Sequence, residues 1–273
     1  MQKLEDIKPQ QSIELLKSLH ILTRDGKINQ DSRRKLKQVY HLYNFAEPIL
    51  EKIKKDNEKF LIVDHGCGKS YLGFILYDLF IKNTLGSVTG IESRNELIEN
   101  TKDLASKLKF ERMSFVNSKI ARSKELILND VDMVTALHAC DTATDDAIRF
   151  GLERKAKFML LVPCCQAEIA KHLRRDKAQS LKKPLAELWR HGIHTVEMGS
   201  HLTNVLRCLL LESQGYKVTV TELVGWEHSM KNELIIAEYI GSKKGNAIER
   251  IDNILEEFNL QTLKPRFNFN QKN

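Results

Sequence analysis

From residue 59 onward, short apolar runs alternate with longer amphipathic runs, and this alternation constrains the fold more than any other feature of the sequence. The apolar runs are not interrupted by polar residues at every second position, which is typical of strands buried on both faces of a parallel sheet. They cover residues 60–64, 87–92, 114–116, 132–137 and 157–162. The alternation predicts a doubly wound α/β domain with helices on both faces of the sheet.

Two further apolar runs, 217–223 and 233–240, close this pattern, and only the loop 224–232 separates them. Parallel neighbours need a crossover of about a dozen or more residues, so this pair is predicted to be an antiparallel hairpin. We therefore expect a Rossmann-like sheet of seven strands whose last hairpin is antiparallel.

The chain divides into three expected segments: a helical region over 1–58, the main domain over 59–241 with a basic insertion at 167–203, and a helix and tail over 242–273. Within the first, Asp31 is expected to cap a helix running to Leu42, and Pro48 to lie in the first turn of a separate helix. A helix over 204–214 should follow the insertion. The tail after Lys264 is expected to be frayed.

A glycine motif, D-H-G-C-G-K-S, follows the first predicted strand and opens a helix. Gly66 and Gly68 permit a tight turn and a close approach of backbone to ligand, and the helix N-terminus favours a negatively charged ligand group. A phosphate-binding loop would need glycine where Val63 stands, and a dinucleotide loop would need glycine at Tyr71. The pattern that fits as it stands is acid-x-G-x-G, with Asp64 as the acid.

Polar residues also end the second and third predicted strands. Glu92 is placed to accept hydrogen bonds from both hydroxyls of a ribose, although a surface glutamate beginning a helix is the alternative. Asn117 and Ser118 follow the third strand, where adenine contacts are expected, although a simple polar turn is nearly as consistent with the sequence.

A third polar group follows the fourth and fifth strands, in L-H-A-C-D-T-A-T-D and V-P-C-C-Q. Ligands of open α/β sheets bind beyond the carboxyl ends of the strands, so these residues should face the reacting atoms. Each also has a structural alternative, because Asp141 could only cap the next helix, His138 could be a core histidine, and Cys164 and Cys165 could be small buried apolar residues.

The three motifs together resemble a family of S-adenosylmethionine-dependent methyltransferases that includes eukaryotic tRNA 2′-O-methyltransferases of the acceptor stem. The methyltransferase domain of the glutathione S-transferase C-terminal domain-containing protein is similar too. The resemblance covers residues 60–166 well and the hairpin more loosely. It implies the class I methyltransferase sheet and S-adenosyl-L-methionine as cofactor, whose methionine half would meet the glycine turn. The implied cofactor-binding residues are Asp64, Gly66, Cys67, Gly68, Glu92, Asn117 and Ser118.

Two chemistries fit the expected transfer site. His138 or Asp141 could act as the general base for a ribose hydroxyl, or Cys164 or Cys165 could attack a pyrimidine ring before C5 methylation. Zinc binding by His138, Cys140, Cys164 and Cys165 is disfavoured, because adjacent cysteines fit tetrahedral geometry poorly and the C-x₂₋₄-C spacing is missing. We therefore expect no metal.

The net charge is +7 with a pI near 9.0, which suits a polyanionic partner such as RNA. Basic residues gather in the insertion beside the transfer site, where they would contact phosphates; a solvated helical lid is the alternative. A second basic run, 33–37, lies in the first segment. The insertion contributes Lys171, Arg174, Arg175, Lys177, Lys182 and Lys183.

We accordingly expect an RNA methyltransferase, with a small-molecule methyltransferase or a non-catalytic RNA-binding protein on the same fold as alternatives. Five cysteines form no even disulfide framework, which favours reduced thiols and a cytoplasmic location. The first ten residues lack the apolar core of a signal peptide. No apolar run approaches the ~20 residues of a membrane span. The oligomeric state is left open.

Overall fold

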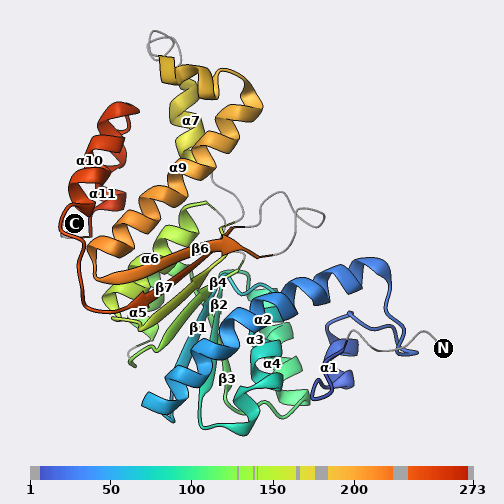
Figure 1. Cartoon of the computed structure of the whole chain (residues 1–273). Helices are drawn as coiled ribbons and strands as arrows, with labels where there is room; N and C mark the ends of the chain where they lie inside the picture. Colours follow the sequence, from blue (N-terminus) through green and yellow to red (C-terminus); the bar gives the residue numbers. More distant parts are fainter. Residues whose placement is uncertain are drawn as a thin grey trace.

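A seven-stranded sheet lies at the centre of the structure, in the order β3-β2-β1-β4-β5-β7-β6 (Figure 1). The structure is a computed structural model that describes residues 7–127, 129–137, 139, 141–163, 167–175, 184–223 and 233–269. Neighbouring strands from β3 to β5 are parallel, whereas β7 is antiparallel to both β5 and β6. The doubly wound sheet and its antiparallel hairpin are therefore confirmed. The strands are β1 Leu61–His65, β2 Ser87–Glu92, β3 Met113–Asn117, β4 Met133–Ala136, β5 Phe158–Leu161, β6 Tyr216–Glu222 and β7 Glu233–Tyr239.

Helices cover both faces of this sheet. One hydrophobic cluster joins one sheet face to helices α1 Ile13–Ser18, α2 Gln30–Asp56, α3 Tyr71–Leu79 and α4 Asn95–Lys107. A second cluster joins the other face to α6 Thr142–Glu153, α9 Gly192–Ser213 and α10 Ala247–Glu257. The described part of the first segment, residues 7–58, thus shares its core with the sheet. The short elements are η1 Ile81–Asn83, η2 Ile120–Arg122, α5 Ser123–Leu126 and η4 Gln261–Leu263.

The two helices expected between residues 31 and 55 are one continuous helix, α2, so the predicted break is wrong. Its N-cap is Asn29, whose side chain accepts a hydrogen bond from the Ser32 N–H at 2.8 Å, and not Asp31. Pro48 lies inside the helix, where it removes one backbone hydrogen bond. The helix continues because a single buried stripe runs along it on both sides of the proline. The stripe consists of Leu36, Val39, Leu42, Tyr43, Ala46, Ile49, Leu50 and Ile53.

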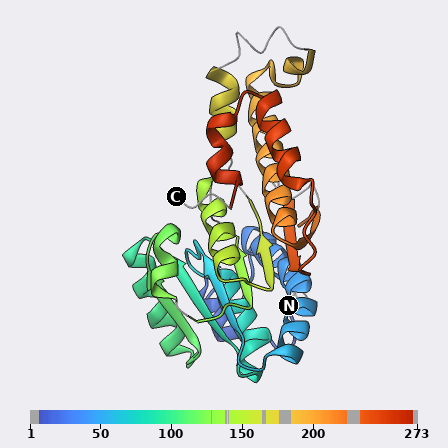
Figure 2. The ribbon, with the colours of Figure 1, turned by 90° about the vertical axis from the view of Figure 1, so that its left-hand side faces the viewer.

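Beyond the sheet, α7 Glu168–Arg175, η3 Pro184–Trp189, α9, α10 and α11 Lys264–Phe267 form a helical arm (Figures 1 and 2). The last third of the predicted insertion, residues 192–203, is therefore the first half of α9, which begins at Gly192 and not at residue 204. The close approach of α7 and α9 needs Gly199, since a Cβ there would meet the Ala170 backbone N at 2.7 Å. The tail expected to be frayed is packed as far as Phe267, which is buried. No helix among the described residues is long and apolar enough to cross a membrane.

The strand order also locates the site. From β1 the chain winds outward through β2 to β3 and then returns to place β4 on the other side of β1. The connections on either side of this reversal diverge, which opens a crevice at the carboxyl ends of β1 and β4. The glycine motif lies at this point.

Candidate functional site

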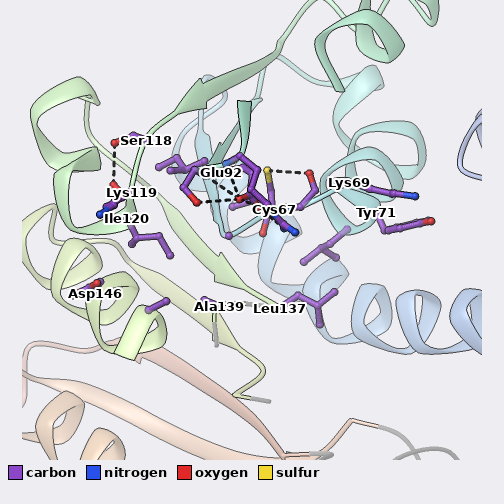
Figure 3. A pocket seen from close by; sticks show the side chains of 18 residues that line it. Cys67, Lys69, Tyr71, Glu92, Ser118, Lys119, Ile120, Leu137, Ala139 and Asp146 are labelled. Carbon is purple, nitrogen blue, oxygen red and sulfur yellow. Dashed lines mark hydrogen bonds and ion pairs between the residues drawn. The ribbon is translucent and has the colours of Figure 1, made fainter. Parts of the chain in front are cut away.

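A cavity of about 580 Å³ opens at the carboxyl ends of β1, β2 and β4 (Figure 3). Side chains and backbone from all three strand ends line it, together with the start of α6 and the loop after β3. Six of the seven predicted cofactor-binding residues line it: Asp64, Gly66, Cys67, Gly68, Glu92 and Ser118. The structure therefore brings together residues that the sequence spreads over 55 positions, from 64 to 118.

The turn after β1 depends on its two glycines. Gly66 and Gly68 have φ angles of +62° and +57°, in the left-handed region that favours glycine. A Cβ on Gly66 would lie 3.4 Å from the Ala139 Cα, so the loop after β4 closes directly against the turn. The Cys67 N–H donates to the Ile91 carbonyl of β2 at 3.0 Å. The turn is thus held by both neighbouring strands, and its glycines leave room for a ligand.

Asp64 is the buried acid of the site. Its side chain is 3% exposed, and Oδ1 accepts a hydrogen bond of 2.7 Å from the Thr135 hydroxyl of β4. Burial raises the pKa of Asp64 to about 7, although the Thr135 hydrogen bond lowers it. A cationic group entering the cavity would favour the ionised carboxylate. Asp64 can therefore bind an ammonium group at neutral pH.

Glu92 ends β2 and carries a carboxylate that is already hydrogen-bonded. Oε2 accepts from the Gly68 N–H at 3.1 Å, and Arg94 donates from its side chain to both carboxylate oxygens. Burial raises the pKa of Glu92, but the hydrogen bonds and charge of Arg94 and the Gly68 N–H lower it to about 2. Glu92 is therefore ionised at neutral pH and is a strong hydrogen-bond acceptor.

The two side chains that flank Gly66 are packed and carry no charge. Cys67 is 7% exposed, and burial raises the pKa of its thiol, which argues against a reactive thiolate. His65 is fully buried against the Phe150 ring, and its Nε2 lies 3.2 Å from the Ser123 hydroxyl. Burial lowers the pKa of His65 to about 3, so it stays neutral. Both residues support the turn by packing.

The residues near the end of β3 form a cavity wall that has both polar and apolar side chains. The Ser118 N–H donates to the Glu92 carbonyl at 3.0 Å, and Ser118 lines the cavity. Asn117 does not line it, because its amide donates to the Asn95 side chain at 2.8 Å. Ile91 and Ile120 also line the cavity and offer apolar faces on which a planar base could pack.

The transfer side of the cavity is formed by the loop after β4, where Leu137 and Ala139 line the wall. His138, Cys140, Cys164 and Cys165 lie outside the described residues, so their predicted roles stay predictions. Among the described residues no group of three or more metal-ligating side chains occurs.

Asp141 lies outside the cavity, whereas a general base would have to face it. It is not among the residues that line the cavity, and its Oδ1 accepts hydrogen bonds from the Ala167 and Glu168 N–H groups at 3.0 and 3.4 Å. It therefore caps the start of α7 and ties the loop after β4 to the arm. The expected alternative, a cap on the next helix, does not describe this geometry, because the Asp141 side chain makes no capping hydrogen bond to α6.

A buried ion pair holds the same loop from the other side. Arg207 of α9 is 1% exposed and donates to both carboxylate oxygens of Asp145 at 2.7 and 3.0 Å. Its Nη2 also donates to the Asp141 carbonyl at 2.8 Å. From the C-terminal segment, Arg266 lies 3.6 Å from Asp145 and 3.0 Å from Glu168. Four segments of the chain thus converge behind the transfer side.

The basic residues predicted in the insertion divide between the described and the undescribed chain. Lys171, Arg174 and Arg175 are exposed on α7, whose opposite face is buried against the arm. Lys177, Lys182 and Lys183 lie outside the described residues. Asp141 ties the start of α7 to the loop after β4, and the helix runs outward from there in the arm (Figure 1).

Several residues of the cavity were missed from the sequence. Arg94 stands two positions after Glu92, and the sequence pattern predicts a role for the glutamate but none for the arginine. Ala143 and Asp146 line the cavity from one face of α6, and burial raises the pKa of Asp146. Their spacing of three on a helix that follows a strand end is a signal that could have found them. Asp146 can accept a hydrogen bond from a ligand amino group.

Comparison with known proteins gives a family match. A family model described as a methyltransferase domain matches residues 34–172, about half of the chain. The mouse (Mus musculus) glutathione S-transferase C-terminal domain-containing protein is 26% identical over 165 residues, which are 60% of this chain and 24% of that protein. The match thus spans about a quarter of the mouse protein's length.

Solved methyltransferase structures are similar at low identity. An S-adenosylhomocysteine-bound methyltransferase of Podospora anserina aligns over 84% of this chain and 88% of its own, with 11% identity and a TM-score of 0.48. Magnesium protoporphyrin IX methyltransferase of Synechocystis aligns over 83% and 94%, with 13% identity and a TM-score of 0.46. A putative rRNA methylase of Clostridium thermocellum aligns over 72% and 96%, with 15% identity and a TM-score of 0.44.

Proposed function

Because the chain belongs to the methyltransferase-domain family and is an S-adenosylmethionine-dependent methyltransferase, we propose a substrate for it, namely RNA, which it methylates on ribose or base. The observation that carries the proposal is the basic helix α7, whose start Asp141 ties to the loop after β4, the loop that also forms the transfer side of the cavity.

The cavity residues fit this cofactor. Asp64 suits the ammonium group, the amides at the start of α3 suit the carboxylate, and Glu92 suits the ribose hydroxyls. Gly66 and Gly68 leave the space that side chains would fill. The cofactor supplies a methyl group on a positively charged sulfur, and the chain supplies its position.

The exposed cations on α7 favour RNA over a small substrate, because they suit phosphate groups. Lys171, Arg174 and Arg175 are exposed on one face of a helix whose other face is anchored by Ile169 and Leu173. A small substrate would bind within the cavity and would need no cations at the rim. A chain of phosphates would reach from the cavity to this helix.

A second basic surface lies on the opposite flank of the cavity. The Tyr71 hydroxyl at the start of α3 donates to the Leu19 carbonyl at 3.1 Å, and the Ser32 hydroxyl of α2 donates to the His20 carbonyl at 3.3 Å. These contacts hold the first turns of α2 beside the glycine turn. Exposed cations follow on that helix, namely Arg34, Lys35 and Lys37. RNA contacting both flanks would lie across the cavity mouth.

For the chemistry, the chain needs a group that removes a proton from the attacking atom. His138 precedes Ala139 of the cavity wall and is our candidate for a ribose hydroxyl. Asp141 already accepts two backbone N–H bonds, so we assign it a positioning role. If the target were C5 of a pyrimidine, Cys164 or Cys165 would act as a nucleophile that adds to the ring before methylation and leaves again when the C5 proton is lost.

The substrate test is transfer of a labelled methyl group from the cofactor to total RNA or to a small-molecule extract of the same cells. We expect nuclease-sensitive label in RNA, and mass spectrometry of the nucleosides then identifies the atom. Label confined to small molecules would contradict the RNA substrate. His138→Ala should slow transfer by about 10²–10⁴-fold without changing cofactor affinity; unchanged transfer would exclude His138 as the base.

The role of α7 is tested by replacing Lys171, Arg174 and Arg175 together with glutamine, which favours helix. RNA affinity should fall, and the slope of log affinity against log salt should decrease by about 2–3. The matched control replaces Lys55, Lys59 and Lys107 with glutamine, since these exposed lysines lie at the opposite edge of the sheet. Equal losses of RNA affinity in both variants would mean that only the net charge matters, and would contradict the proposed surface.

A further inference from the structure

The Glu92 carboxylate has an internal partner inside the cofactor cavity. Arg94 Nε lies 3.0 Å from Oε1 and Nη2 lies 3.0 Å from Oε2, which is a two-pronged ion pair. The backbone also contributes, with the Ser93 and Arg94 N–H groups at 2.9 and 3.1 Å from Oε1 and the Gly68 N–H at 3.1 Å from Oε2.

This arrangement uses the acceptor capacity of the carboxylate. An ionised carboxylate offers about four lone-pair sites, and five N–H groups of Gly68, Ser93 and Arg94 already point at Glu92. A ribose diol needs both oxygens as well. Three of these donors are backbone amides of the glycine turn and of the end of β2, so they cannot move away from Glu92. The Arg94 side chain is 66% exposed, so its guanidinium can swing out into solvent.

The guanidinium also takes up ligand space. It lines the cavity, and the atom nearest to a Cβ built on Gly68 is Arg94 Nη2, at 3.8 Å. The side chain therefore reaches back over the glycine turn, which is where the proposed cofactor site lies. Ribose binding at Glu92 and the Arg94–Glu92 ion pair exclude each other.

We propose that Arg94 competes with the cofactor for Glu92, so that opening of this ion pair sets the affinity of the enzyme for S-adenosylmethionine. The inference rests on the cofactor position at Gly66 to Glu92 and not on the RNA substrate. Salt screens a largely exposed ion pair, so a rise in ionic strength should free Glu92. The enzyme would then bind its cofactor more tightly at higher salt, opposite to the salt dependence expected for RNA.

The test is calorimetric titration with S-adenosylhomocysteine, which needs no substrate. Arg94→Ala should bind about three- to tenfold more tightly than the unmodified chain, as expected for release of a partly exposed charge pair. The control Lys102→Ala removes a cation of α4, the helix that Arg94 precedes. Lys102 pairs with Glu99 at 3.1 Å outside the cavity, so its removal should change nothing.

Salt gives a second measurement that needs no variant. Between about 0.05 and 0.5 M salt the affinity of the unmodified chain should rise, because the Debye length falls from over 10 Å to a few Å, and Arg94→Ala should lose this dependence. Weaker binding by Arg94→Ala would make Arg94 a cofactor ligand and overturn the proposal, as would affinity that is independent of both Arg94 and salt. Unchanged binding by Glu92→Gln would instead place the cofactor elsewhere and remove the premise.

Discussion

The cofactor side and the transfer side of the cavity are held in different ways. On the cofactor side, Asp64 and Glu92 are fixed by neighbouring strands and by backbone amides of the turn beside them. On the transfer side, the loop after β4 is fixed by side chains from far along the chain, through Arg207 on α9 and Arg266 near the C-terminus.

The two sides therefore depend on different interactions. The geometry of the cofactor side is set by strand pairing, so this geometry should persist as long as the strands pair. The transfer side depends on buried charges whose removal is costly. Changes on the transfer side should therefore affect stability or transfer, and changes on the cofactor side should affect binding. Four predictions test this separation.

The largest effect is expected from Arg207→Ala. It leaves the Asp145 carboxylate buried without its main partner, so the free energy of unfolding should fall by about 3–5 kcal/mol. Urea denaturation measures this fall, and the folded fraction should bind S-adenosylhomocysteine within about twofold of normal. Arg190→Ala breaks an exposed pair with Glu187 on the same arm and should cost at most about 1 kcal/mol. Equal costs in the two variants would contradict the role of the buried pair.

Next in size is Gly66→Val on the cofactor side. A β-branched side chain is strained at φ +62° and would press on Ala139, so cofactor affinity should fall at least about a hundredfold. Gly26→Val is the control, because Gly26 has φ +75° and no atom within 4 Å of its Cβ position. It carries similar strain and should bind cofactor normally. Normal binding by Gly66→Val would show that the site is misplaced.

The third prediction concerns pH. The pKa of Asp64 is raised to about 7, so below pH 7 the carboxyl is protonated and cannot pair with an ammonium group. Cofactor affinity should therefore fall by up to about tenfold per pH unit between pH 7 and 5.5, and level off above pH 7. Calorimetry in two buffers should show proton release on binding near pH 6. Asp64→Asn should bind weakly at every pH; a pH dependence that survives this change would come from another group.

The smallest effect is expected at Asp141. Asp141→Ala removes the cap of α7 and should lower the free energy of unfolding by about 1 kcal/mol. Asp141→Asn keeps an oxygen acceptor for the Ala167 N–H but cannot take up a proton, so it should keep both stability and transfer rate. Loss of transfer in Asp141→Asn with unchanged stability would restore Asp141 as the general base.

What could be predicted from the sequence follows the same division. The strand ends, the glycine turn and Glu92 are local signals, since a few adjacent residues decide strand, turn or helix start. Six of the seven predicted cofactor-binding residues line the cavity for this reason. The exception is Asn117, whose side chain is held outside the cavity by a hydrogen bond to Asn95, a residue 22 positions away.

Other features depend on partners that no local pattern reveals. Arg207 stands in an apolar run, and its partner Asp145 is 62 positions away. The first half of α9 is polar in sequence, and its helix rests on packing against Ala170 of α7. Pro48 predicts a helix boundary by propensity, but the buried stripe of α2 overrides it. Phe267 is buried against the arm, although the residues around it resemble a tail.

The packing of α2 limits how the molecule can be cut. The family match begins at residue 34, inside α2, and stops at residue 172, inside α7. A fragment trimmed to that segment would lose β6 and β7, which pair on β5, and would expose apolar side chains that α9 covers. Such a truncation should aggregate on expression. The segment that the family model matches is therefore shorter than the unit that folds, and a minimal expressible piece has to keep α2 whole together with α9, β6 and β7.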